Sequence, residues 1–503
     1  MKTPSNELFL LIKSLDTQEK VYFKKNQNNK RYLLFFDIIS QMEVYNEDKL
    51  KQEIANKEHI KNLKFVKSYV YEAILDSLTN YQLNNSPDAI LSRQTHQIKI
   101  LTKKCLYTSA KKLVVKAEKL AQNHGKLNHS LIISSLKRDI IISEMGILKT
   151  QSHRDQYEKE LRLIEELKNE VDYTNLNVTV TNVILTQYKV SSEKLAELNK
   201  LLKSPLLLNE KSALTFTSKL IFYDTLGTIY YLLDNWTLCY NCYKKLFLRH
   251  QQNDSYMKEN TVNYLKIANR LIVSSIRLNK LNEVNLLGKK IERYVNLLPS
   301  KDKNMNALKV YNQIQVNITD SYLQSLNIKE ALRLSVELEK SITRYSNKQG
   351  YVLFYFNFTL IYFYLGNYKM ALHQINKVLN NEETDLRSDT VLSSRIVSLI
   401  IHYELHNLDL LNSHTKSTTR YFSKKGALDG YSKALISFFS KNIILLGDHT
   451  IKEDRKKIKD AFVNLKKQLL SANHKEIPGN FEFMAWIDSK IENISILEVM
   501  KRG

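Results

Sequence analysis

The chain has 503 residues, of which only 11 are glycine and 5 are proline, so few of its turns can depend on these residues. This composition argues against an all-β protein and against glycine-rich phosphate-binding loops, and it fits long helices joined by short polar turns. Basic side chains outnumber acidic ones by 75 to 52, but the excess of +23 is spread along the chain. Such a diffuse excess favours a solvated, lysine-rich surface over a dedicated nucleic-acid-binding segment.

The N-terminal segment does not have the pattern of a signal peptide. Its apolar run, residues 8 to 12, is too short for a signal-peptide core and follows Glu7. Three cysteines, at positions 105, 239 and 242, are too few for a disulfide framework and favour a reducing compartment. We therefore predict a cytoplasmic protein without a membrane span.

Residues 1–84 are predicted to form a compact head of short helices. Asp16 is followed three positions later by Glu19, which is the pattern of a capping box at a helix start. Two short helices before a longer one would suit a helix-turn-helix, but the third helix shows an apolar face rather than a basic one. The residues of this face are Phe65, Tyr69, Ala73, Ile74 and Leu78. A docking or capping bundle is therefore favoured over a DNA-reading head.

A helical array is predicted for residues 85–445. Its start is marked by Ser86, a residue suited to a helix N-cap, and by Pro87, which fits the first helical position. Four later segments share one pattern, in which an apolar helix, a short polar turn and an amphipathic helix follow one another. Each second helix has a compact residue near its start, where two antiparallel helices approach closely. These compact residues are Cys239, Val284, Ala331 and Ala371.

The four segments resemble the tetratricopeptide repeat. The positions that carry the resemblance are Leu226, Gly227, Tyr230, Cys239, Tyr243, Tyr362, Gly366, Tyr368 and Ala371. The compact residues lie 45, 47 and 40 positions apart, whereas the repeat of that family is about 34 residues long. The resemblance implies an all-α solenoid of helical hairpins, with the N-terminal helical head at one end and a C-terminal helical cap, residues 446–503, at the other.

The whole chain is also similar to a group of large bacterial tetratricopeptide-like proteins with no established biochemical activity. Residues 7–25 and 480–491, the latter reading NFEFMAWIDSKI, carry this similarity. It adds an expectation about architecture and none about catalysis.

The stretch YVLFYFNFTLIYFYLG, residues 351 to 366, is the most apolar part of the chain. Its apolarity alone would suit a membrane-spanning helix. However, GNYKMALHQINKVL follows it, which makes it the first helix of the hairpin that best matches the repeat. An inner helix of a solenoid is covered on most sides, so we interpret the stretch as buried.

Candidate catalytic and metal-binding patterns are weak. Cys239 and Cys242 form a CxxC pair, but no second pair completes a zinc site, and the first cysteine occupies the helix-crossing position. His402 and His406 lie four positions apart and could chelate a metal, although the HExxH order is absent. Nucleotide-binding glycine motifs are also missing. The sequence therefore predicts a protein that is not an enzyme and needs no cofactor or metal.

The concave groove of the solenoid is the predicted binding site. Candidate contact residues are Lys266, Arg270, Arg277, Asp320 and Tyr364, and the three cations on one helix favour an acidic partner. We expect a scaffold or adaptor that binds a protein or peptide in this groove. The alternative is a regulatory protein whose head binds nucleic acid while the repeats sense a ligand. Neither the partner's identity nor the oligomeric state follows from the sequence.

Overall fold

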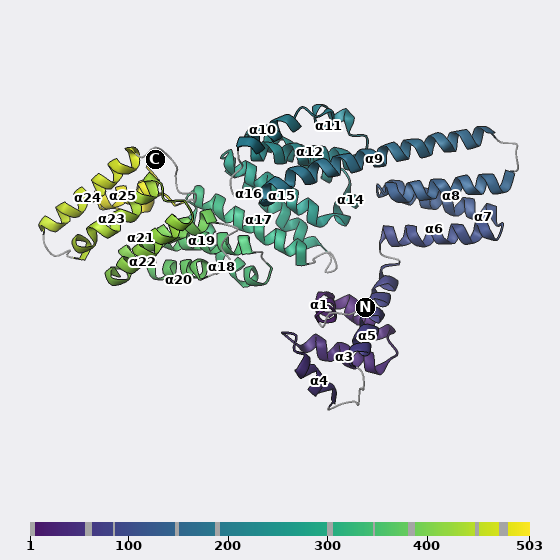
Figure 1. Ribbon diagram of the computed structural model, residues 1–503, viewed down its shortest axis with the longest axis horizontal. Helices are drawn as coiled ribbons and strands as arrows, with labels where there is room; N and C mark the ends of the chain where they lie inside the picture. Colours follow the sequence, from purple (N-terminus) through teal and green to yellow (C-terminus); the bar gives the residue numbers. More distant parts are fainter. Residues whose placement is uncertain are drawn as a thin grey trace.

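The computed structural model describes residues 6–55, 63–83, 86–145, 150–186, 192–298, 305–345, 348–380, 388–447, 452–471 and 481–502. Every regular element in these ranges is helical, as the composition predicts. Figure 1 shows an elongated molecule in which helices follow one another in chain order, with the N-terminal head beside the array. The predicted all-α class is therefore confirmed.

Within residues 6–55 and 63–83, the head contains five helices around a core of its own. They are α1 (Glu7–Ser14), α2 (Thr17–Asn26), α3 (Lys30–Gln41), α4 (Glu47–Ala55) and α5 (Leu63–Gln82). The predicted capping box starts α2, because Asp16 Oδ1 accepts from the Glu19 amide at 2.8 Å and Glu19 Oε2 accepts from the Asp16 amide at 2.9 Å. The expected apolar face of α5 is partly wrong: Val70 and Ile74 are buried, whereas Phe65 and Tyr69 are exposed.

A first stack of hairpins follows the head. It comprises α6 (Pro87–Lys103), α7 (Tyr107–Asn123), α8 (Leu127–Met145) and the first half of α9 (Thr150–Thr186). Pro87 is the first residue of α6, as predicted. Ala110 and Ala117 are fully buried, which allows α7 to lie close to its neighbours α6 and α8. The second half of α9 continues beyond this stack and packs on α12 (Phe216–Leu232).

The second stack contains the four hairpins predicted from the sequence. They are α12 with α13 (Trp236–Gln251), α15 (Thr261–Arg277) with α16 (Leu281–Leu297), α17 (Met305–Gln324) with α18 (Ile328–Tyr345), and α19 (Lys348–Tyr364) with α20 (Tyr368–Leu379). The short helices α10 (Ser192–Leu201) and α11 (Pro205–Leu208) and a 3-10 turn at Glu210–Ser212 precede α12, and the short helix α14 (Asp254–Glu259) lies between α13 and α15. The compact residues Cys239, Val284, Ala331 and Ala371 are all buried, as the crossing of two helices requires.

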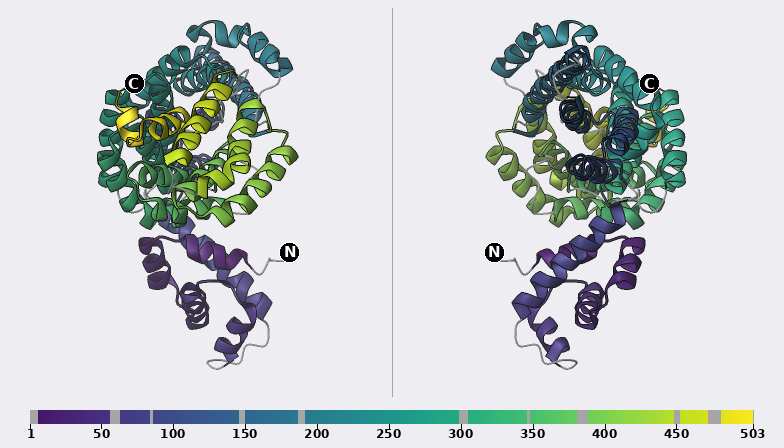
Figure 2. Two further views of the ribbon diagram at one scale, coloured as in Figure 1. Left: turned by 90° about the vertical axis from the view of Figure 1, so that its left-hand side faces the viewer. Right: turned by 90° about the vertical axis from the view of Figure 1, so that its right-hand side faces the viewer.

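The hairpins continue towards the C-terminus. α21 (Ser388–Glu404) pairs with α22 (Leu408–Lys424), α23 (Gly430–Gly447) pairs with α24 (Lys452–Ser471), and α25 (Phe483–Glu492) and α26 (Ile496–Met500) follow. The first helices also pack on one another, in the order α15, α17, α19, α21 and α23. Figure 2 shows that the hairpins follow a ring when the molecule is viewed along its long axis, with α25 inside it.

The turns within the hairpins share one backbone device. In the hairpin turns that the structure describes, a residue in the left-handed conformation ends the first helix, and the next amide bonds back to a carbonyl five positions earlier. In the α12–α13 turn, Asp234 has φ 57° and the Asn235 amide reaches Tyr230 O at 2.9 Å. The other left-handed residues at such turns are Cys105, Asn279, Leu326, Gly366 and His406. Backbone geometry therefore repeats more faithfully than residue type.

The most apolar stretch lies at the centre of the largest core. In α19 the side chains of Phe354, Phe358 and Ile361 are almost completely buried between neighbouring hairpins. Among the described residues, no helix is both long enough and apolar enough to span a membrane. Burial within the array accounts for the apolarity of this segment.

Candidate functional site

Three predicted contact residues lie on one face of α15. Lys266 and Arg277 are exposed, and Arg270 lies between them, partly buried. Spacings of four and seven positions place all three on the same side of a helix. α15 is the first helix of its hairpin, and it packs on α17, the first helix of the next hairpin.

Arg270 is engaged within the protein. Its guanidinium forms an ion pair with Asp224 of α12, and Asn177 Nδ2 of α9 donates to the same carboxylate at 3.2 Å. Burial alone would lower the pKa of Arg270, but Asp224 and Tyr243 outweigh it and raise that pKa. The pair therefore joins α12 to α15 and leaves Arg270 neutralised.

Lys266 and Arg277 differ from Arg270 in having no such partner. Within the described ranges, no acidic side chain lies within ion-pairing distance of either cation. Arg277 lies over the ring of Trp236, 5.3 Å from its centroid, which orients the guanidinium without neutralising it. Two uncompensated cations thus lie eleven positions apart on one face of α15.

A pair of side-chain amides extends this polar surface from α15 to α17. Asn317 Nδ2 of α17 donates to Asn269 Oδ1 of α15 at 2.7 Å. Asp320 follows one turn further along α17 and is partly exposed, with Gln324 Nε2 donating to its carboxylate at 3.2 Å. Asn177, Asp224, Arg270, Asn269 and Asn317 together form a polar ladder across α9, α12, α15 and α17.

Tyr364, the last predicted contact residue, lies elsewhere. Its side chain on α19 is only 4 % exposed, and burial raises its pKa. The ring of Phe481 stacks on it with centroids 6.3 Å apart, so the C-terminal segment covers this position. The structure therefore groups the three cations of α15 and Asp320 on neighbouring helices, but it does not leave Tyr364 open to a partner.

A buried carboxylate, Glu404, contributes to the attachment of the C-terminal segment. Trp486 Nε1 donates to Glu404 Oε1 at 2.7 Å, and Lys490 Nζ donates to Glu404 Oε2 at 2.6 Å. The Trp486 ring also packs against Tyr403 and Phe462. These contacts fix α25 on the α21 to α24 end of the array.

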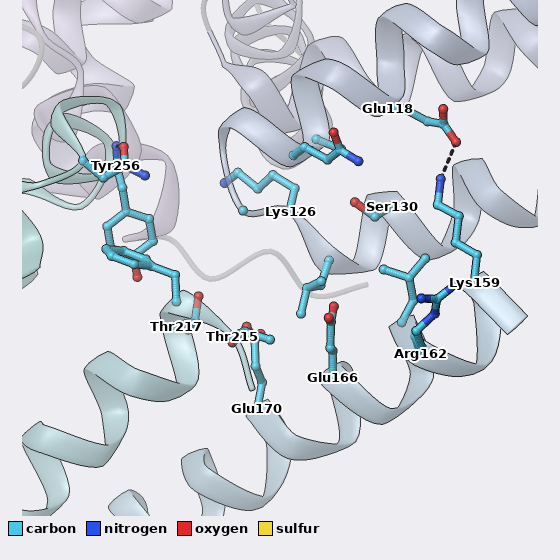
Figure 3. A pocket seen from close by; sticks show the side chains of 17 residues that line it. Glu118, Lys126, Ser130, Lys159, Arg162, Glu166, Glu170, Thr215, Thr217 and Tyr256 are labelled. Atoms are coloured by element: carbon cyan, nitrogen blue, oxygen red, sulfur yellow. Dashed lines mark hydrogen bonds and ion pairs between the residues drawn. The ribbon is translucent and has the colours of Figure 1, made fainter. Parts of the chain in front are cut away.

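A separate cleft of about 480 Å³ lies where the two stacks meet along α9. The turn between α7 and α8 forms one wall, and the starts of α12 and α14 form the other. Figure 3 shows Lys159 reaching across to Glu118, while Glu166 and Glu170 follow on α9. Lys126 bridges the stacks, because its Nζ contacts Asp88 at 2.7 Å and Glu259 at 3.3 Å.

Glu170 is the most perturbed acid of this cleft. Burial raises its pKa and nearby Glu166 adds to the effect, while hydrogen bonds from Thr215 and Thr217 oppose it. Thr215 Oγ1 donates to Glu170 Oε1 at 2.6 Å.

Both cysteines of the CxxC pair are buried. Burial raises the pKa of Cys239 to about 12 and that of Cys242 to about 11, so both thiols are protonated at neutral pH. A protonated thiol is a poor nucleophile and a poor metal ligand.

The histidine pair has an unexpected geometry. His402 lies beside His414, with ring centroids 4.7 Å apart and ring planes tilted by 56°, whereas His406 occupies a left-handed turn position. No group of three or more His, Cys, Asp or Glu side chains in the described residues could hold a metal ion.

Comparisons with protein-family models, with curated proteins and with solved structures give no match to this chain. The similarity to the tetratricopeptide repeat therefore stays a prediction from the quoted residues. The sequence did not predict the cleft between the two stacks or the burial of Tyr364 under Phe481, because in both places segments far apart in the chain come together. The aromatic residues Phe481, Phe483 and Trp486 were the sequence signal from which the burial of Tyr364 could have been predicted.

Proposed function

We propose that the protein is a non-enzymatic cytoplasmic scaffold that binds an extended, acidic segment of a partner protein along the exposed face of the first helix α15. The observation that carries this proposal is the pair of uncompensated cations, Lys266 and Arg277, on one face of α15. The tetratricopeptide-like pattern of the hairpins is consistent with it, because such arrays present their first helices to bound peptides.

The spacing of the two cations limits what they can bind together. Eleven helical positions separate them, which corresponds to about 16 Å along the axis. An extended chain covers about 3.3 Å per residue, so two acidic side chains about five residues apart would match both cations. An acidic residue at each end of a short extended segment is therefore the expected recognition element.

The polar ladder supports an extended backbone between these two contacts. Asn269 uses its Oδ1 for Asn317, which leaves its Nδ2 to donate to a peptide carbonyl. Arg270 cannot add a third strong charge contact because Asp224 already neutralises it. Specificity is thus assigned to the two outer cations, and the ladder positions the chain between them.

Affinity capture with charge variants tests this proposal. The double variant Lys266→Glu and Arg277→Glu should lose partner proteins that the wild-type chain retains. A matched control, Lys289→Glu and Lys329→Glu, makes the same change in net charge on the second helices α16 and α18, where both lysines are exposed. Equal loss in both double variants, or retention of nucleic acid alone by the wild type, would contradict the proposal.

A further inference from the structure

Helix α9 exposes a long apolar stripe that the groove does not use. Five large apolar side chains, each between 46 % and 59 % exposed, lie on one face of it: Tyr157, Leu161, Ile164, Val171 and Val178. Single exposed apolar residues are common on soluble proteins, but a row of five on one helix face is not. We name this face the α9 seam.

The spacing of the seam is that of a coiled coil. Successive members are separated by four or three positions, and the series is completed by Lys168 and Asn175, which are also exposed. A repeat of seven residues keeps such a stripe facing a partner helix, and a polar residue within it fixes the register of pairing. From Tyr157 to Val178 the seam extends about 32 Å, the length of a full helix–helix contact.

An acidic edge runs beside the seam. Glu158, Glu165 and Asp172 follow one another at intervals of seven positions on the same flank, and all three are exposed. In the part of the chain that the structure describes, no lysine or arginine pairs with them. α9 carries seven acidic and four basic side chains, in a chain whose net charge is +23.

The charges argue against a second copy of this chain as the occupant. In an antiparallel pair of α9 helices, the two acidic edges would meet each other and repel. In a parallel pair, the acidic edge would face Glu160, Leu167 and Thr174, none of which is basic. The seam therefore lacks the charge complementarity that a self-pairing coiled coil uses.

We propose that the α9 seam is a docking surface for an amphipathic helix of another protein, with an apolar face flanked by lysine or arginine. The apolar stripe supplies burial, and the acidic edge selects a basic partner and sets its direction. This surface lies on a different flank of α9 from the cleft residues Glu166 and Glu170. It gives the protein a second binding surface, independent of the cations on α15.

Two synthetic helical peptides of about 24 residues, long enough to span the seam, test this inference. They share one apolar heptad face, and one carries lysine and the other glutamate on both flanks. Fluorescence anisotropy with the full chain should show the lysine peptide binding at least about tenfold more tightly than the glutamate peptide. Absence of binding, or equal binding of both peptides, would overturn the proposal.

Variants locate the binding on α9. Ile164→Asp with Val171→Asp should weaken the lysine peptide at least about tenfold. The control pair Leu286→Asp with Val336→Asp changes exposed apolar residues of α16 and α18 and should leave binding unchanged. The triple reversal Glu158→Lys, Glu165→Lys and Asp172→Lys keeps the apolar seam and should reverse the peptide preference. Unchanged binding in the first pair, or unchanged preference in the reversal, would refute the site.

Sedimentation equilibrium of the wild-type chain tests whether a second copy of this chain, rather than a helix of another protein, occupies the α9 seam. A monomer is expected at concentrations where the lysine peptide binds. A dimer that dissociates on Ile164→Asp with Val171→Asp would instead show that a second copy occupies the seam, and it would overturn the proposed partner chemistry.

Discussion

Trp486 donates its indole N–H to Glu404, 82 positions earlier in the chain, at 2.7 Å. The other oxygen of the same carboxylate accepts from Lys490 at 2.6 Å, and the Glu404 side chain is only 7 % exposed. This acid therefore joins α25 to the end of α21, in addition to the ion pair of Lys466 in α24 with Asp488 in α25. Phe481, two residues before α25, stacks on Tyr364, so the same C-terminal segment covers part of the first helix α19.

Glu404→Ala should destabilise the protein. It leaves the indole N–H of Trp486 and the ammonium of Lys490 without their acceptor, which should lower the free energy of unfolding by about 2–4 kcal/mol. Urea unfolding followed by tryptophan fluorescence measures this, and Trp236→Phe isolates the signal of Trp486, since the chain has 2 tryptophans. Glu492→Ala breaks an exposed pair with Arg502 and should cost less than about 0.5 kcal/mol. Equal costs for the two variants would refute the role of Glu404.

Phe358→Ala tests the burial of the apolar stretch. The side chain is 1 % exposed and packs on Phe354 and Tyr362, with ring centroids 5.5 and 4.9 Å apart. Removing the ring should cost about 3–5 kcal/mol through lost burial and the cavity that remains. Leu286→Ala, at a side chain 70 % exposed, should change stability by less than about 0.5 kcal/mol. Chemical denaturation of both variants gives the comparison, and a similar small change in each would mean that α19 is not buried.

Gly227 and Gly288 form a matched pair of helical glycines. A Cβ at Gly227 would lie 2.8 Å from the ring of Tyr243, whose hydroxyl shares a hydrogen bond with Thr228. A Cβ at Gly288 would meet the end of the flexible Ile318 side chain at 2.7 Å. Gly227→Ala should therefore destabilise by about 1–3 kcal/mol.

Gly288→Ala should be nearly neutral, because Ile318 can move and alanine favours helix by about 1 kcal/mol. Thermal unfolding ranks the two variants. The reverse order would show that the close contact between α12 and α13 is not rigid.

The pH dependence of stability should follow two buried histidines. Burial lowers the pKa of His250 to about 4, with a small opposing effect of Asp224, and burial together with His414 lowers the pKa of His402 to about 4. The unfolded chain binds these protons near pH 6.5, whereas the folded chain does so only near pH 4. Acidification through this window therefore favours unfolding, by up to about 3 kcal/mol for each histidine.

Urea midpoints measured between pH 7 and 4 should fall steadily in the wild type. His402→Gln should flatten that slope, while His96→Gln, at an exposed position, should leave it unchanged. A slope that survives His402→Gln undiminished would mean that this side chain does not titrate as described.

Local pattern was enough to predict the hairpins, but not their turns. The compact residues Cys239 and Ala371 mark helix crossings because close approach restricts size, and size is visible in the sequence. The turn conformation cannot be predicted from residue type, since Asp234, Leu326 and His406 take the same left-handed conformation as Gly366, although glycine is the residue that adopts it most readily. Here the packing of two helices imposes the turn, whatever residue occupies it.

The candidate site, too, could be predicted from the sequence only in part. Helical spacing alone predicts that Lys266, Arg270 and Arg277 share a face of α15. It does not reveal that Asp224 neutralises Arg270 or that Phe481 covers Tyr364, because both contacts join distant segments. The seven-residue pattern of the α9 seam is present in the sequence, but only the folded chain shows that the seam is exposed.

Photo-crosslinking from one position tests the central claim most directly. A photoreactive amino acid at Val273, between Lys266 and Arg277 on α15, should crosslink to an acidic segment of a partner protein in a lysate of the source organism. The same group at Leu286, on the second helix α16, should not give this adduct, and Lys266→Glu with Arg277→Glu should abolish it. Adducts to nucleic acid from position 273, or protein adducts that persist in the charge variant, would contradict a scaffold that binds acidic segments along its first helix α15.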